Sequence, residues 1–288
     1  MQIVTDRGMD LTAEQMAGLN IHFVPLTLSL DGRMYRSGED IQPEAFYQLL
    51  AKSADFPTTS QPSAGEFADL YRRLAATDPD ILSIHISSGL SGTANAAKAA
   101  ADLVPEANIT VVDTKTLSAA EGWQVQAAAW AANAGWSLDN ILKMLDGIRS
   151  AADTLYTLAT LKYLIHGGRI SHLKGLVASM LNIKPVIGVE KENGTYVQQG
   201  QGRTLEQSIR RIAEVVAQQH APGTALRVQA LHGANPDGAA KLREIIDGLF
   251  QCTWLPTGPI APVLGAHTGP GLVGLVYAPQ AVFADLPF

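Results

Sequence analysis

The stretch SIHISSGLSGTANAAKAAADL, residues 83–103, holds the unit from which the fold is predicted. Its first residues alternate between apolar and polar, which is typical of a β-strand. The turn SSGLSGT follows, and the alanine-rich run after it predicts a helix over about residues 95–103. A strand that passes through a short turn into a helix is the repeating unit of a parallel sheet covered by helices. This stretch therefore indicates an α/β fold.

The rest of the first half repeats this alternation. Short apolar runs and amphipathic runs follow each other, and Ser63 with Glu66 forms the pattern of a helix-capping box. We predict strands over residues 2–6, 22–30, 81–86 and 109–113, and helices over residues 43–52, 63–76, 119–133 and 138–150. This order predicts an N-terminal, mainly parallel α/β/α domain over residues 1–155.

The second half has a different pattern. The runs 184–190 and 195–203 are separated by Glu192-Asn193-Gly194, and an Asn-Gly pair favours the tight turn of a β-hairpin. Helical runs at 205–219 and 236–250 follow, together with strand-like runs at 226–233 and 271–279. We therefore predict a C-terminal α+β domain with hairpins over residues 156–288.

Bulk composition excludes several classes of protein. The net charge of the 288 residues is −6, which does not favour nucleic acid as a partner. The single cysteine, Cys252, excludes an internal disulfide framework and is typical of a reducing cytoplasm. The sequence contains no basic and apolar leader and no run of 18 apolar residues. We therefore expect a cytoplasmic protein without an integral membrane segment.

The turn SSGLSGT is suited to an anion, because glycines permit close approach and the N–H groups of the following helix are free. The sequence lacks both the Lys-bearing phosphate loop and the complete G-x-G-x-x-G fingerprint of dinucleotide sites. Gly89-Leu90-Ser91-Gly92-Thr93 also lacks the last glycine of a hydrolase nucleophile elbow. A phosphate, a reacting carbonyl and a carboxylate all remain open as ligands, beside a simple helix cap by Ser91.

Three further stretches hold candidate binding residues. FPTTSQPS (56–63) places Thr59 and Ser60 between two prolines, in either a rigid binding loop or an exposed linker. GAHTGPG (265–271) places His267 among small residues, with no second His or Cys at metal-ligand spacing, so we predict no metal site. GGRISHLKG (167–175) is either a solvated basic turn or an anion site, with Arg203 as a further cation. The basic residues of that stretch are Arg169, His172 and Lys174.

These motifs together resemble those of a known family. TTSQPS, SSGLSGT, GGRIS and GAHTGPG, with VTD near the start, are similar in kind and order to the motifs of the DegV family, the fatty-acid-binding subunits of bacterial fatty acid kinase. The resemblance runs from Ile3 to about Tyr277. It implies two α/β domains with a long-chain fatty acid in a tunnel between them.

The resemblance also implies a role for particular residues. Thr59, Ser91 and His267 occupy the positions that hold the fatty-acid carboxylate in the family, and Arg203 occupies a position that contributes in some members. We add the neighbouring Ser60 and Gly92 to this carboxylate-binding set. Arg169 occupies the position that faces the kinase or assists the phosphate.

The family's activity implies a carrier without catalysis of its own and without a cofactor. A separate ATP-dependent kinase phosphorylates the bound carboxylate, and the acyl phosphate feeds phospholipid synthesis. Two alternatives stay open: an acyl hydrolase using Ser91 with His267, and a binder of a small phosphate or nucleotide. One departure is clear, because the family often has D-S-x-x-D where this chain has Asp6-Arg7-Gly8-Met9-Asp10. Arg7 therefore either reaches the head group or faces solvent.

Overall fold

The computed structural model describes residues 1–173 and 183–287, so Lys174 of the basic stretch lies outside the described residues. A parallel four-stranded sheet, in the order β2-β1-β6-β7, organises the first half of the chain. It consists of β1 (Gln2–Asp6), β2 (Ile21–Val24), β6 (Asp80–His85) and β7 (Asn108–Asp113). This confirms the strands predicted at residues 2–6, 81–86 and 109–113.

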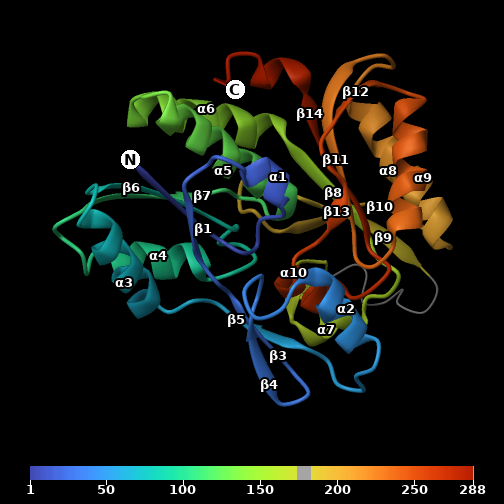
Figure 1. Ribbon diagram of the computed structural model, residues 1–288. Coiled ribbons are helices and arrows are strands. Elements are labelled where there is room, and N and C mark those ends of the chain that lie inside the picture. Colours follow the sequence, from blue (N-terminus) through green and yellow to red (C-terminus); the bar gives the residue numbers. More distant parts are fainter. Residues whose placement is uncertain (174–182, 288) are drawn as a thin grey trace.

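Helices cover both faces of this sheet (Figure 1). The helices α3 (Ala64–Ala75) and α4 (Thr93–Ala101) pack on one face, around Phe67 and Tyr71. The helices α5 (Ser118–Asn133) and α6 (Leu138–Ala151) pack on the other. The short α1 (Ala13–Met16) precedes β2. The predicted capping box of α3 is present, since the Ser63 hydroxyl accepts from the Glu66 N–H.

The prediction of one strand over residues 22–30 is wrong. The chain forms β2 up to Val24 and then β3 (Thr27–Leu30), and the two strands belong to different sheets. Pro25 lies between them, and proline has no N–H to continue a ladder. β3 pairs with β4 (Arg33–Arg36) and with β5 (Thr58–Ser60), which lies inside the predicted 56–63 loop. The helix α2 (Pro43–Leu50) lies between β4 and β5 in sequence.

A seven-stranded mixed sheet organises the second half, in the order β10-β9-β8-β14-β11-β12 with β13 beside β11. Its strands are β8 (Asp153–Thr157), β9 (Lys184–Val189), β10 (Tyr196–Gly202), β11 (Ala225–His232), β12 (Gln251–Trp254), β13 (Gly258–Pro259) and β14 (Val273–Pro279). The predicted hairpin is confirmed as β9 and β10, and Gly194 in its turn has a φ of 68°.

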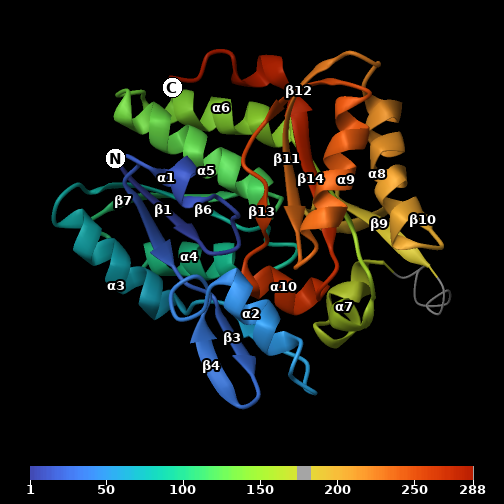
Figure 2. The same ribbon diagram turned by 45° about the vertical axis from the view of Figure 1, so that its right-hand side comes forward.

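The helices of the second half divide between two places. α8 (Leu205–Gln219) and α9 (Pro236–Asp247) cover the outer face of the large sheet, as Figure 2 shows. α7 (Lys162–His166), the 3-10 turn η1 (Arg169–His172) and α10 (Pro262–Thr268) lie near the ends of strands, and α10 packs against both α7 and α2. The 3-10 turn η3 (Gln280–Phe283) packs on α6 near the C-terminus. No helix in the described ranges has the length and apolar character needed to cross a membrane.

The two halves meet over a shared apolar core. Its largest cluster contains side chains from β3, α2, α5, β8, β9, α10 and β14. This cluster therefore joins the small sheet, the helices α2, α5 and α10, and the large sheet. The α/β fold class is thereby confirmed. The last strand of the parallel sheet ends at Asp113, and the first strand of the large sheet begins at Asp153. The predicted domain boundary at residue 155 falls within β8 and stays a prediction.

Candidate functional site

A small pocket, with a cavity volume of about 30 Å³, lies at the junction of the two halves. Three of the residues that line it are the predicted ones, Thr59, Ser91 and His267, and Arg169 is a fourth. Four residues that lie far apart in the sequence therefore meet at one pocket. The remaining walls are mainly apolar and consist of Leu26, Ile86, Leu90, Leu117, Tyr196, Val263 and Leu264.

Thr59 and His267 form the first polar pair of this pocket. Thr59 is the middle residue of β5 and stands opposite Leu28 of β3, whereas His267 lies in the last turn of α10. The Thr59 Oγ1 lies 2.7 Å from the His267 Nε2, a hydrogen bond between the two halves. The His267 Nδ1 is buried and has no hydrogen-bond partner among the described residues. A hydrogen on Nδ1 would be an unsatisfied buried donor, so this arrangement favours a hydrogen on Nε2.

This tautomer leaves the Thr59 hydroxyl hydrogen free. When the His267 Nε2–H donates to the Thr59 oxygen, that oxygen is used as an acceptor and its own hydrogen can be donated into the pocket. Burial lowers the pKa of His267 to about 4, and the nearby charges of Arg169 and His166 lower it in the same direction. His267 is therefore neutral at neutral pH and acts as a donor to Thr59.

The low pKa of His267 should make the stability of the fold depend on pH. Below pH 6.5 the unfolded chain binds a proton at this residue and the folded chain does not, so stability is lost as the pH falls toward 4. Between pH 7 and pH 5 this loss is about 2 kcal/mol. Urea unfolding of the unliganded protein and of His267→Gln at both pH values measures it as the difference between the two proteins. An equal pH dependence in both proteins would contradict the assignment.

Ser91 supplies the second polar group of the pocket. Its Oγ lies 2.8 Å from the Oγ1 of Thr93 and accepts from the Thr93 N–H at 3.4 Å. Thr93 is fully buried, and α4 begins at this residue with Gly92 at the N-cap position. When the Thr93 hydroxyl also donates to Ser91, the Ser91 hydrogen is free to point into the pocket. The pocket then contains two hydroxyl donors fixed from behind.

The glycines of SSGLSGT are needed for packing against other loops. A Cβ on Gly89 would lie 2.4 Å from the backbone oxygen of Asn193 and 2.7 Å from that of Gly194. A Cβ on Gly92 would lie 2.0 Å from the Oε1 of Gln61. Gly89 therefore lies against the hairpin turn and Gly92 against the TTSQPS loop, and close approach of a ligand to these glycines stays a prediction. These contacts place Ser91 near Thr59.

Arg169 connects the pocket to the surface. Its Nη1 donates to the Gly167 oxygen at 2.7 Å and its Nε donates to the Leu90 oxygen at 3.3 Å, so it ties η1 to the SSGLSGT turn. Arg169, Ser91 and Leu90 also line an open depression on the outer side. Its other lining residues are Ser88, Gly89, Gly92, Gly167, Gly168 and Ser171. Ser91 and Arg169 thus have access both to the inner pocket and to the outside.

The structure does not bring every predicted residue into this pocket. Arg203 is exposed just before α8, where its N–H donates to Gln207, and it is not among the lining residues. Ser60 is exposed at the end of β5 and does not line the pocket. Gly92 lines only the outer depression. Arg7 stacks on Phe23, with its Cζ 3.6 Å from the ring centroid, and lines a different cavity.

The sequence motifs did not identify the apolar residues that line the pocket. Leu26, Ile86, Leu117, Tyr196, Val263 and Leu264 come from separate elements, and nothing local distinguishes them from other core residues. Val263 and Leu264 are one helical turn before His267, so their place on α10 was the one available signal.

The described residues around His267 do not include a third group that would complete a hydrolase triad. His267 bonds to Thr59, and no carboxylate of the described chain orients its Nδ1, so a nucleophile–base–acid series is absent there. A Ser–His–Asp series does exist elsewhere, where His85 lies 2.6 Å from the Ser83 Oγ and 3.0 Å from the Asp6 Oδ2. All three side chains are fully buried, so that series joins β1 to β6 and meets no substrate. The described residues also contain no cluster suited to a metal ion.

Comparisons with known proteins agree with this geometry. The model of the DegV family matches residues 1–280. A DegV domain-containing protein of Deinococcus radiodurans is 34% identical over 279 residues, covering 97% of this chain and 96% of the relative. A fatty-acid-binding DegV family protein of Thermus thermophilus superposes with a TM-score of 0.87 at 32% identity, covering 97% of this chain and 99% of its own. DegV of Bacillus subtilis, a fatty acid binding protein, superposes with a TM-score of 0.86 at 28% identity, with coverages of 97% and 99%. The chain belongs to the DegV family.

Proposed function

We propose that this protein binds a long-chain fatty acid and presents its carboxylate to a separate ATP-dependent kinase, which forms the acyl phosphate used in phospholipid synthesis. The observation that carries the binding role is the meeting of Thr59, Ser91 and His267 in one apolar-walled pocket. The fatty-acid-binding relatives support the choice of ligand. We place this activity in the cytoplasm.

The polar end of the pocket suits a carboxylate. The hydroxyls of Thr59 and Ser91 each have their oxygen engaged from behind, by His267 and by Thr93, and so can donate. Arg169 adds a positive charge at the same end. A desolvated carboxylate without partners would cost more than its tail gains, so these donors are a condition for binding.

The apolar walls suit the tail. Ile86, Leu117 and Tyr196 belong to the largest apolar cluster of the molecule, which continues from the pocket toward Trp123 and Phe283. A C16 acyl chain that displaced some of these side chains and was buried among them would remove about 14 methylene groups from water, on the order of 11 kcal/mol before losses. Immobilising the ligand and ordering side chains offset several of these. A nucleotide is polar and has no long apolar surface to bury against these walls.

The position of Arg169 supports presentation to a partner. The carboxylate held by Ser91 lies next to the outer depression, and Arg169 lines both spaces. A kinase bound over this depression can approach the carboxylate while the tail stays buried. Arg169 then stabilises the negative charge that develops during phosphoryl transfer.

Extraction of the bound ligand tests the proposed function. Protein purified from a bacterial host should release fatty acid into organic solvent, detected by mass spectrometry, and the delipidated protein should bind added oleate or palmitate. Absence of an acyl ligand together with no binding of either acid would refute the binding role. Incubation with ATP and a bacterial fatty acid kinase, followed by detection of acyl phosphate, tests the presentation role separately.

Removing either hydroxyl should weaken binding. Thr59→Ala and Ser91→Ala each delete a donor to a charged group, and we expect losses of about 2 kcal/mol, or roughly thirtyfold in Kd for oleate. Thr58→Ala is the matched control, because Thr58 is exposed on the same strand. A panel of acyl esters assayed with the same proteins tests the hydrolase alternative, which requires turnover that Ser91→Ala removes. Unchanged oleate affinity in both variants would show that the carboxylate lies elsewhere.

A further inference from the structure

The first turn of α10 is capped by side chains from the first half of the chain. A helix start needs acceptors for its free N–H groups, and α10 has no side-chain cap of its own because Ala261 is at the N-cap. The Oδ1 of Asp10 accepts from the Ala261 N–H at 2.7 Å, and the Oγ of Ser37 accepts from the Val263 N–H at 3.3 Å. Both acceptors are buried. Two side chains from the first half of the chain therefore hold the start of α10, which belongs to the second half.

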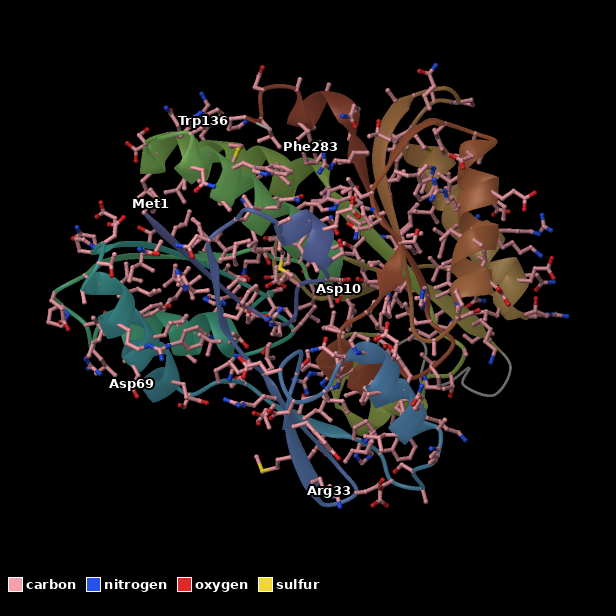
Figure 3. All side chains as sticks on the ribbon, in the orientation of Figure 1. Met1, Asp10, Arg33, Asp69, Trp136 and Phe283 are labelled. Carbon is pink, nitrogen blue, oxygen red and sulfur yellow. The ribbon has the colours of Figure 1, made fainter. Side chains whose placement is uncertain are left out.

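Asp10 is itself held in one orientation. The hydroxyl of Ser118, the first residue of α5, donates to the Asp10 Oδ2. Ser118 is fully buried and has a φ of 61°, a backbone conformation that residues other than glycine rarely adopt. Its N–H donates to the Gly8 oxygen at 2.8 Å, which keeps it there. Asp10 is labelled near the middle of Figure 3 and is only 8% exposed.

The helix α10 transmits the position of its start to its end. A Cβ on Gly265 would lie 2.7 Å from Phe46 Cε1 and 2.7 Å from the Tyr47 hydroxyl, so the helix is seated closely on α2. The six residue steps from Ala261 to His267 span about 9 Å along a helix axis. A helix this short and this closely packed moves as one body, so a shift of its start also moves His267.

We propose that Asp10 is a positioning residue of the fatty-acid site, whose carboxylate holds the start of α10 and thereby sets His267 against Thr59. The inference rests on the proposed function for its effect on ligand binding. Asp10 touches neither the pocket nor its lining polar groups. Its influence passes through the two bonds to α10 and α5.

The surroundings of Asp10 make this role sensitive to pH. Burial raises the pKa of Asp10 to about 7, against the lowering effect of its bonds to Ser118 and Ala261. Burial and the Asp10 charge raise the pKa values of Tyr47 and Tyr156, and burial with the charges of Asp6 and Asp10 raises the pKa of Glu121. Asp10 is surrounded by titratable and charged groups from several elements. They are Glu121 on α5, Tyr47 on α2, Tyr156 on β8, and Glu44 and Arg7 in the wall of the adjoining cavity.

Protonation changes what Asp10 can hold. The ionised carboxylate accepts from both Ser118 and Ala261 and attracts the positive start of α10, whereas the protonated acid is a weaker acceptor without charge. Ligand affinity should therefore fall as the pH drops from 8 to 6.

The contribution of Asp10 to the free energy of unfolding changes with pH in the opposite direction to the ligand affinity. A raised folded pKa favours the protonated folded state, so this contribution is present at acid pH and lost as the pH rises through 7.

Oleate binding to the delipidated protein at pH 6 and pH 8 tests the proposal. Asp10→Ala removes both bonds and should weaken binding about tenfold or more at pH 8. Asp10→Asn keeps an acceptor for Ala261 without the charge, so its affinity should match that of the unsubstituted protein at pH 6 and should not change with pH. Gln126→Ala is the control, since it removes a buried bond of 2.7 Å to the Gln15 oxygen without touching α10. Ser37→Ala removes only the second cap and provides a milder variant if Asp10→Ala does not fold.

A second measurement does not depend on the ligand. NMR titration should show the His267 pKa near 4 in the unliganded protein and shifted toward 6.5 in Asp10→Ala, because the displaced ring gains solvent. An unchanged His267 pKa in Asp10→Ala and in Ser37→Ala would overturn the positioning role. So would oleate affinity that falls equally in Gln126→Ala. If the unsubstituted protein binds no oleate, the proposed function fails while the NMR result still decides the role of Asp10.

Discussion

Replacing Gly167 with alanine should abolish most of the fatty-acid affinity while leaving the fold intact. Gly167 follows α7 with a φ of −74° and a ψ of −3°, which alanine adopts without strain. An added Cβ would, however, lie 2.1 Å from the His267 Nδ1. The imidazole ring must then turn away from Thr59, since the α10 backbone is closely packed. We expect a loss of about 3 kcal/mol, or more than a hundredfold in Kd, because the Thr59 hydroxyl loses its support and the pocket is partly filled.

Calorimetric titration of oleate into the delipidated variant measures this effect. The thermal midpoint should fall by only a few degrees, since the substitution disturbs one side chain. Gly147→Ala in α6 is the matched control, because a Cβ there meets no atom within 4 Å. Alanine is the better helix former, so this control should keep full affinity and gain up to about 1 kcal/mol of stability. Oleate affinity in Gly167→Ala within threefold of the unsubstituted protein would remove His267 from the carboxylate site.

Replacing Gly89 with alanine should lower the free energy of unfolding by about 3 kcal/mol. The added Cβ would overlap backbone atoms, the oxygens of Asn193 and Gly194, and backbone atoms cannot turn aside as a side chain can. The hairpin turn must move, and the 2.8 Å bond from the Ser87 hydroxyl to the Gly194 oxygen is lost with it. The substitution therefore breaks the contact between the SSGLSGT turn and the hairpin turn of the second half.

Urea unfolding of Gly89→Ala beside Gly65→Ala measures this loss. A Cβ on Gly65 lies 3.7 Å from the Ser63 Oγ, an ordinary contact, and its place in α3 should make that variant neutral or slightly more stable. Oleate affinity should also fall in Gly89→Ala, since Ser91 is two residues away on the same turn. A stability equal to that of the unsubstituted protein would show that the hairpin turn yields freely and does not fix the head-group loop.

The sequence alone determined the local elements. Alternating strands and amphipathic helices in the first half, and the Asn193-Gly194 turn in the second, follow from side-chain periodicity and backbone preference within a few residues. The error at residues 22–30 has the same origin, because apolar character continues through Pro25 although the ladder does not. Thr59, Ser91, His267 and Arg169 were proposed because their four motifs occur together in the order of a known family, and the structure places these residues around one pocket.

Tertiary structure alone decided how those motifs meet. The sequence placed Arg203 at the head group, but the start of α8 keeps it exposed outside the pocket, and Arg7 stacks on Phe23 at another cavity. The part played by Asp10 also depended on the fold. Its contact with Ala261 joins positions 251 residues apart, and such a contact has no local signature. Periodicity and motifs report the interactions of neighbouring residues, whereas the pocket between the two halves is built from contacts between segments that only the packed fold brings together.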